Sequence, residues 1–450
     1  MLIDILKWMI KVDNMDQLLD KILTDVSKQV DYAEIYMENS NSTDVDILND
    51  NINYAKEENI NGIGIRVIKD QKQGFAYTTN MSRIDETIKQ AILNSTLNSK
   101  DENVGIIEKK QDYKKVDGLY DKQLENPDLQ EAIDFSEELI KLTKDKKCNP
   151  TGGGYGFGKS TIHILNSNGV DVSESTTTCA GSISVNVEDN DLVSSAYYFD
   201  ASHYSNIDAQ MIVDKATDLA LNSRNAKPTE TRDTQVVLDY FAAVSLLGTF
   251  FSALNSENKQ RGRSKFKDQL NEKVSSENFT LIDDGTMPGA LNSAICDDEG
   301  SPTQKTILIE EGILKNFIYD TYHAKKDEMD VTTTANAVRS GYNSVPSVGF
   351  TNLKLDFKEV TPITDITEGI IVDSVMGAHT ANPISGDFSV EALNSFEIKN
   401  GSIENPIKKV MISGNIFEIM QSATAATEES RQLGSCITPK ILVNKLRVIG

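Results

Sequence analysis

Cysteine is scarce in this sequence, and no two cysteines lie close together. The 450 residues hold four, Cys148, Cys179, Cys296 and Cys436, and none forms a C-x-x-C pair. A small domain held together by disulfides is therefore excluded, and reduced thiols in a cytoplasmic protein are expected. A chain of this length, with 39% hydrophobic residues, buries a sizeable core without such cross-links.

Positive charge and long hydrophobic runs are also in short supply. The chain has 45 Lys and Arg against 68 Asp and Glu, which gives a formal net charge of −23. Binding to nucleic acid draws on clustered cations, so no direct nucleic-acid partner is expected. The longest uncharged run, residues 240–256, is shorter than the ~20 residues that cross a bilayer, so no membrane span is expected either.

The sequence does have clear hydrophobic periodicity, which predicts an α+β protein of two domains. The N-terminal half is predicted to be α/β with a strand-rich middle segment. The C-terminal half is predicted to be β-dominated around one buried helix. The predicted units cover residues 1–105, 106–233 and 234–450, and the second unit is expected to pack with the first.

Local signals place the elements within these units. Turn-prone Gly, Asn and Pro separate runs with strand-like alternation from runs with helical spacing. Helices are predicted at 15–30, 82–99, 128–145, 206–223 and 240–255, and strands at 31–40, 43–50, 61–80, 151–199 and 234–238. The segment 61–80 is a predicted hairpin with its turn near Gly74. Small residues, Gly248 among them, are expected to let the helix 240–255 pack closely against its neighbours.

One motif matches a nucleotide site by letter only. Residues Gly153–Ser160 fit the phosphate-loop pattern G-x-x-x-x-G-K-[ST]. That loop needs a strand before it and a helix after it, so that backbone amides and the helix N-terminus hold the phosphate. Here Ile162 and Ile164 alternate with polar residues after the motif, which predicts a strand. Nucleotide binding is therefore not expected.

Two residue groups offer weaker chemical signals. Cys296 or Cys436 could pair with His323 or His379 as a nucleophile and base, although buried thiols and hydrogen-bonded imidazoles explain these residues better. The adjacent carboxylates at 297–299 could chelate a cation or differ in pKa for acid–base work. A solvated turn explains these carboxylates at least as well.

The segment 377–389 is a denser candidate, because it combines small residues with His379, Gly386 and Asp387. Such a loop lets the backbone approach a ligand closely, and His379 and Asp387 could hydrogen-bond the main chain of a peptide. These three residues are the candidate substrate-binding residues, against the alternative of an ordinary glycine-rich loop. We expect Gly386→Val to reduce substrate processing with little loss of stability.

Two longer strings resemble a known family. Residues 296–326 read CDDEGSPTQKTILIEEGILKNFIYDTYHAKK, and residues 377–418 begin GAHTANPISGDFSVEALNSFEIKNG. Both resemble the TldD/PmbA family, named after a proposed modulator of DNA gyrase, and the second is similar to its PmbA, or TldE, branch. The resemblance covers residues 30–450. It implies a metallopeptidase fold, in which the TldD branch carries an H-E-x-x-x-H helix that binds zinc through two His and a distant Cys and supplies Glu as general base.

This chain departs from that motif at its chemical positions. Where the resemblance places His, Glu and His, the chain has Gly248, Thr249 and Ala253, none of which binds a metal or accepts a proton. The resemblance then implies a TldE-like subunit without catalytic residues, metal or other cofactor. Its partner would be a TldD-like subunit that holds zinc, and the substrate a peptide or an unfolded protein.

Two alternatives to this subunit role stay open at the level of sequence. The chain could be a non-catalytic peptide-binding or scaffolding homo-oligomer, or an autonomous thiol peptidase that uses Cys296 or Cys436. Under the subunit interpretation and the scaffold interpretation alike, a dimer or a higher oligomer is expected.

Overall fold

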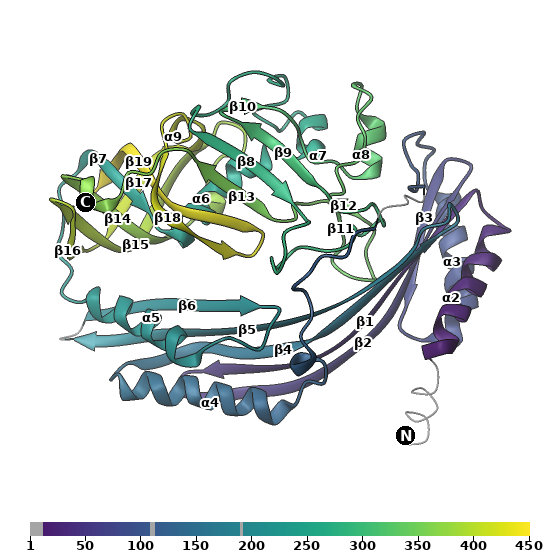
Figure 1. Cartoon of the computed structure of the whole chain (residues 1–450), viewed down its shortest axis with the longest axis horizontal. Helices are drawn as coiled ribbons and strands as arrows, with labels where there is room; N and C mark the ends of the chain where they lie inside the picture. Colours follow the sequence, from purple (N-terminus) through teal and green to yellow (C-terminus); the bar gives the residue numbers. More distant parts are fainter. Residues whose placement is uncertain (1–11, 109–112, 190–191) are drawn as a thin grey trace.

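The computed structural model describes residues 12–108, 113–189 and 192–450, and β-sheets organise it (Figure 1). The first sheet has the strand order β3-β2-β1-β4-β5-β6 and is antiparallel throughout. Its strands are β1 (Tyr32–Leu48), β2 (Asn51–Lys69), β3 (Lys72–Thr78), β4 (Asn149–Asn166), β5 (Asp171–Asp189) and β6 (Leu192–Ser202). The sheet is long and curved, and the C-terminal half of the chain lies over its concave side (Figure 1).

Helices cover the opposite, convex face of this sheet. They are α2 (Val12–Ser27), α3 (Ile84–Leu97), α4 (Leu129–Asp145) and α5 (Ala209–Asn222). Leu139 and Ile212 of α4 and α5 pack with Ile183 of β5, whereas Leu19 and Ile88 of α2 and α3 belong to a second cluster at the other end. The helices therefore bury one face of each strand and leave the concave face to other partners.

Most predicted elements of the N-terminal half are present, but two predictions are wrong. The predicted strands 31–40 and 43–50 form the single strand β1, and β2 already begins at Asn51. The hairpin turn lies at Asp70 and Gln71, whose φ angles are 53° and 61°, and not near Gly74. Gly74 instead serves packing, because a Cβ there would lie 2.0 Å from the Ala91 carbonyl oxygen of α3.

The second sheet is built from strands of the C-terminal half. Its described strands are β7 (Arg232–Leu238), β8 (Phe279–Asp284), β9 (Lys305–Glu310), β10 (Ile313–Leu314), β13 (Leu353–Phe357), β14 (Glu368–Met376), β15 (Asp387–Lys399), β16 (Ser402–Ile407), β17 (Val410–Asn415), β18 (Thr424–Leu433) and β19 (Cys436–Ile449). Most neighbours are antiparallel, but β7 pairs in parallel with β14, and β13 with β19. This half is β-dominated, as the sequence predicts.

One helix occupies the centre of the C-terminal half. Helix α6 (Tyr240–Ser252) lies against β14 and β19, close to the predicted span 240–255. Helix α9 (Ile416–Ile419) packs against α6. The other short elements of this half are α7 (Ser256–Gln260), α8 (Thr321–Lys326) and the hairpin of β11 (Ala337–Val338) and β12 (Ser347–Val348). The chain is thus an α+β protein with a curved sheet on one side and a helix-centred β-rich half on the other.

The domain boundaries at residues 105 and 233 remain predictions. Residue 105 lies in the segment between α3 and α4, at a position outside any helix or strand, and residue 233 lies at the start of β7. In the described parts of the chain, none of the helices has the length and apolar character needed to cross a membrane.

Candidate functional site

Helix α6 carries the three positions at which the resemblance places a metal motif. The Asp239 carboxylate caps the helix by accepting a hydrogen bond from the Tyr240 amide at 2.7 Å. The buried face of the helix consists of Ala242, Ala243, Leu246, Leu247, Phe250 and Phe251. Ser245 and Gly248 lie exposed on another face, and a Cβ at Gly248 would meet nothing within 4 Å. The prediction that Gly248 permits close packing is therefore wrong, and this face of α6 is open.

The donor chemistry of these positions does not fit a zinc ion. Gly248 and Ala253 carry no donor atom, and Ala253 is fully buried at 0% exposure. Burial raises the pKa of the Cys436 thiol to about 12, so this sulfur is a protonated core atom and not a ready thiolate ligand. Across residues 12–108, 113–189 and 192–450, no group of three or more His, Cys, Asp or Glu could hold a metal.

The structure brings the start of the predicted segment 377–389 to the same helix, as the loop 377–387 that leads into strand β15. The short 3-10 helix η4 (Ala378–Thr380) at the start of this loop lies against α6. Ala378 and Ala381 pack against the hydrophobic core around α6, while His379 is exposed. Two segments that are more than 120 residues apart in sequence, the degenerate motif helix and the candidate substrate loop, thus form one region of the surface.

The other two candidate residues in this loop hold its shape. The Asp387 carboxylate accepts hydrogen bonds from the Ser385 hydroxyl at 2.7 Å and from Asn415 Nδ2 at 2.9 Å, which lower its pKa. Gly386 has a φ of +85°, and a Cβ there would lie 2.4 Å from the Phe417 ring. The expectation that Gly386→Val spares stability is therefore wrong. Whether His379, Gly386 and Asp387 contact substrate stays a prediction.

The segment Gly153–Ser160 lies within strand β4, in the region 151–199 that is predicted to be rich in strands, and β4 is followed by strand β5. Tyr155 and Phe157 pack toward α4, so Gly154, Gly156 and Gly158 face the concave side. A Cβ at Gly158 would lie only 2.4 Å from the Asn41 carbonyl oxygen of β1. The glycines let two strands approach closely in a curved sheet, which accounts for the motif without a phosphate.

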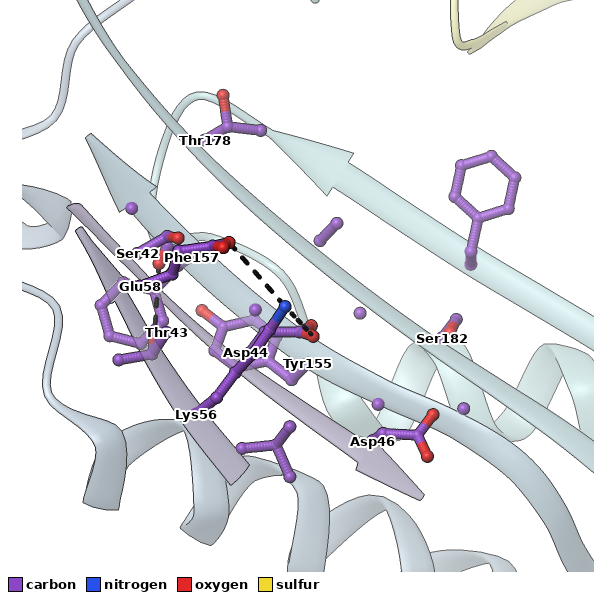
Figure 2. Close-up of a pocket in the computed structure, with 18 of the residues that line it drawn as sticks. Ser42, Thr43, Asp44, Asp46, Lys56, Glu58, Tyr155, Phe157, Thr178 and Ser182 are labelled. Carbon is purple, nitrogen blue, oxygen red and sulfur yellow. Dashed lines mark hydrogen bonds and ion pairs between the residues drawn. The ribbon is translucent and has the colours of Figure 1, made fainter. Parts of the chain in front are cut away.

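Above these glycines, the concave face of the first sheet forms a trough of about 620 Å³ (Figure 2). We call it the sheet trough. Small and hydroxylated residues such as Ser42, Thr178 and Ser182 line it, and carboxylates stand along one side. Lys56 lies 3.9 Å from the Asp44 carboxylate and 3.8 Å from that of Glu58. A surface of hydroxyls and glycines can hydrogen-bond a main chain without selecting particular side chains.

The carboxylates at 297–299 are not a solvated turn, and that interpretation is wrong. Glu299 is 1% exposed and accepts hydrogen bonds from the Arg66 guanidinium at 3.1 Å and the Thr321 amide at 2.9 Å. Asp297 is 8% exposed and accepts from three backbone amides. Burial and the neighbouring Glu299 raise the pKa of Asp297 well above its usual range. This turn fixes the C-terminal half to strand β2.

The geometry opposes a thiol nucleophile. Burial and the nearby carboxylates of Asp297 and Glu174 raise the pKa of Cys296 well above its usual range, whereas a nucleophilic cysteine needs a lowered pKa. His203 lines the same cavity as Cys296, but its Nδ1 lies 2.6 Å from the Thr177 carbonyl oxygen and its Nε2 lies 3.3 Å from that of Ala290. The predicted base His323 is instead bound to Asp320 at 2.8 Å.

One cluster of charged residues could not be predicted from the sequence. A cavity of about 780 Å³ lies where β6 and α5 meet the C-terminal half, and Asp373 and Arg431 line it. Burial and the nearby Asp239 carboxylate raise the pKa of Asp373 to about 7. These side chains come from elements far apart in the chain, and each belongs to an unremarkable strand pattern. No local signal marks the site.

Comparisons with known proteins define the class of this chain as a metallopeptidase-type fold. The family model of the PmbA/TldA metallopeptidase C-terminal domain matches residues 231–450, and those of its domain 1 and central domain match residues 33–95 and 122–224. The chain therefore belongs to the PmbA/TldD metallopeptidase family.

Individual relatives agree with this assignment. The chain is 34% identical to an uncharacterised protein of Methanocaldococcus jannaschii, over 94% of this chain and 98% of that protein. It is 28% identical to the metalloprotease TldD homolog of Buchnera aphidicola, over 91% of this chain and 88% of the homolog. The crystal structure of TldE from Thermococcus kodakarensis matches with a TM-score of 0.89 at 27% identity, and the match covers 96% of this chain and all of TldE.

Proposed function

We propose that this chain is the substrate-holding subunit of a two-component peptidase, with a TldD-like partner that holds zinc. The observation that carries the proposal is the open face of α6. The helix lies beside the candidate substrate loop, yet its accessible positions are Ser245 and Gly248, and Ala253 is buried. A member of this fold that lacks the metal-binding side chains suits a subunit that binds and positions the substrate.

Peptide-bond hydrolysis explains why the partner is required. It needs an activated nucleophile, a proton acceptor and stabilisation of the developing oxyanion. The side chains of Gly248, Thr249 and Ala253 supply none of these, so the metal and its base come from the second chain. In this chain, the hydroxyls of the sheet trough and the loop 377–387 would hold a peptide or an unfolded protein. All four thiols are free, and we place the resulting dimer or larger oligomer in the cytoplasm.

The deciding experiment mixes the purified chain with the TldD-like protein of the same genome and an unstructured fluorogenic peptide. Cleavage is expected only in the mixture. It should vanish with chelator, return with zinc, and survive Cys296→Ala and Cys436→Ala in this chain. A partner whose motif Glu is replaced by Gln serves as the matched inactive control.

Other outcomes would support the alternatives. Chelator-resistant cleavage by this chain alone, lost on either cysteine substitution, would identify a thiol peptidase. Peptide binding by a homo-oligomer without cleavage in any mixture would identify a scaffold. Both results contradict the subunit proposal.

A further inference from the structure

The cavity of about 780 Å³ between the middle segment and the C-terminal half has no role in the proposed function so far. We call it the interdomain cavity. Its lining includes Tyr198, Tyr240, Phe241, Asp373, Arg431 and Lys440. Its volume lies in the range of ligand sites, ~300–1,000 Å³, and such sites favour boundaries between domains.

Arg431 is held rigidly in this cavity by aromatic rings. Its guanidinium carbon lies 4.1 Å from the ring centroid of Tyr198 and 5.2 Å from that of Phe241. The guanidinium also donates a hydrogen bond to the Phe199 carbonyl oxygen, so strand β18 is tied to strand β6. A guanidinium fixed by stacking presents its remaining N–H groups in a set direction, which favours recognition of planar anions.

The charges in the cavity leave Arg431 without a carboxylate partner. Lys440 is neutralised by Asp239, since its Nζ lies 2.5 Å from the Asp239 carboxylate. Of the carboxylates in the described residues, none lies within the 4.0 Å ion-pair distance of Arg431. Lys215, Glu404 and Glu429 line the exposed rim. The Asp373 carboxyl is near enough for the Arg431 charge to act on it, but it makes no ion pair with the guanidinium. A partly buried cation without a carboxylate in direct contact is a site for an anionic group.

Asp373 adds a hydrogen-bond donor to this site. Burial and the Asp239 carboxylate raise its pKa to about 7 against the opposing charges of Lys440 and Arg431, which leaves the carboxyl group protonated in roughly half of the molecules at neutral pH. A protonated carboxyl can donate to an incoming carboxylate. An anion bound nearby would raise the pKa of Asp373 further, so binding would be accompanied by proton uptake.

We propose that the interdomain cavity binds the C-terminal carboxylate of a peptide, with Arg431 on the carboxylate and the aromatic rings against the last side chain. The proposal rests on the proposed function and adds to it a preference for peptide ends. A carboxylate matches the planar fork of the guanidinium, and the rings of Tyr198, Tyr240 and Phe241 provide apolar walls for a side chain.

The first test compares two forms of one labelled, unstructured peptide ending in Leu, with a free carboxylate or with a C-terminal amide. Fluorescence anisotropy with the full chain at pH 7 should show roughly tenfold or greater weakening for the amide. Arg431→Gln should remove this difference. Arg83→Gln is the matched control, because the Arg83 side chain is 66% exposed and pairs with Glu86 on α3. Equal affinity for the two peptide forms would overturn the proposal, even if Arg431→Gln proves too unstable to measure.

Two further measurements separate related explanations. N-acetyl-leucine should compete only weakly with the peptide acid. Competition as strong as that of the peptide itself would mean that the cavity takes small carboxylates, and the peptide-end proposal would fail. Calorimetry in two buffers should show uptake of roughly half a proton per bound peptide at pH 7, and this uptake per bound peptide should vanish in Asp373→Asn. Uptake that persists in Asp373→Asn would contradict the role given to this carboxyl group.

The proposal and the subunit function can fail independently. Preference for the peptide acid without cleavage in any mixture would reject the subunit function and keep the cavity assignment. Cleavage by the mixture with no preference for the free carboxylate would keep the function and reject the cavity assignment.

Discussion

The guanidinium of Arg66 lies 3.1 Å from the carboxylate of Glu299, and the two side chains are 4% and 1% exposed. Arg66 also donates two hydrogen bonds to the Glu34 carboxylate, at 2.9 Å and 2.6 Å. Strands β1 and β2 of the curved sheet are thereby joined to a turn of the C-terminal half. A buried cation between two carboxylates fixes the arrangement of the two halves, because removing it would leave Glu299 without a cation and Glu34 with Arg339 alone.

We therefore expect Arg66→Ala to destabilise the fold by about 3–5 kcal/mol. Urea unfolding followed by circular dichroism would measure the change. Arg83→Ala removes an exposed ion pair on α3 and should cost less than about 1 kcal/mol. Similar small losses for both variants would contradict the role given to the buried pair.

The fold could be predicted where the signal is local. The helices at α3, α4 and α5 were predicted within three residues of their observed bounds, because each buries one stripe of a regular spacing. The segment after the glycine-rich motif was correctly predicted as a strand from the alternation at Ile162 and Ile164, and the motif belongs to the same strand. The turn at Asp70 and Gln71 was missed, because non-glycine residues adopt positive φ there while Gly74 is needed for packing against α3.

The candidate site was less predictable because its determinants are distant in sequence. Burial of Glu299 depends on Arg66, which lies 233 positions earlier, and no local pattern reveals that partner. The same holds for Arg431, whose stacking partner Tyr198 belongs to another half of the chain. Family resemblance located α6 and the loop beside it, but only the structure shows that Gly248 faces open space.

Substitution of Gly386 should cost more stability than substitution of a glycine that also has a positive φ angle but has free space around its Cβ position. Gly386→Ala combines positive-φ strain with a contact 2.4 Å from the Phe417 ring. Gly434→Ala suffers the strain alone, since nothing lies within 4 Å of its Cβ position. We expect about 1–2 kcal/mol of loss at Gly434 and at least about 1 kcal/mol more at Gly386, measured by thermal and urea unfolding. Equal losses would show that the ring yields freely.

Substitutions at two of the motif positions on α6 should change the stability of the chain in opposite directions. Gly248→Ala should stabilise the chain by up to about 1 kcal/mol, because alanine favours a helix and meets no neighbour here. Ala253→His should destabilise it, since the site is fully buried. Elemental analysis after dialysis should find no stoichiometric zinc in the wild-type chain. About one zinc per chain would contradict our interpretation that this helix does not bind a metal.

ATP with magnesium should produce no binding signal at Gly153–Ser160. The Lys159 ammonium already pairs with Glu125 at 2.9 Å, and the strand offers no helix N-terminus to a phosphate. Titration calorimetry is the measurement. A micromolar signal that disappears in Lys159→Ala would contradict this expectation.

Asp373 should make stability depend on pH in the direction opposite to that of a carboxylate in a salt bridge. Its pKa is raised from 3.8 to about 7 by burial and by the Asp239 carboxylate. The folded state therefore holds a proton that the unfolded chain releases near pH 4. The contribution of Asp373 to the free energy of unfolding is therefore complete below pH 4. It falls by up to about 4 kcal/mol as the pH rises to about 7.

Asp373→Asn removes this titration while nearly preserving the shape of the side chain. We expect the variant to match the wild type at pH 4 and to exceed it at pH 8 in urea unfolding. Asp268→Asn, at a side chain that is 82% exposed, is the control and should change little at either pH. In an Asp239→Asn background, Asp373→Asn should gain less stability at pH 8. The negative charge beside Asp373 is then gone, and Lys440 is released toward Asp373. Asparagine at position 239 still caps α6, so the helix itself is preserved. If the gain were the same at pH 4 and pH 8, it would come from packing, and Asp373 would not be the proton-holding group that the interdomain cavity requires.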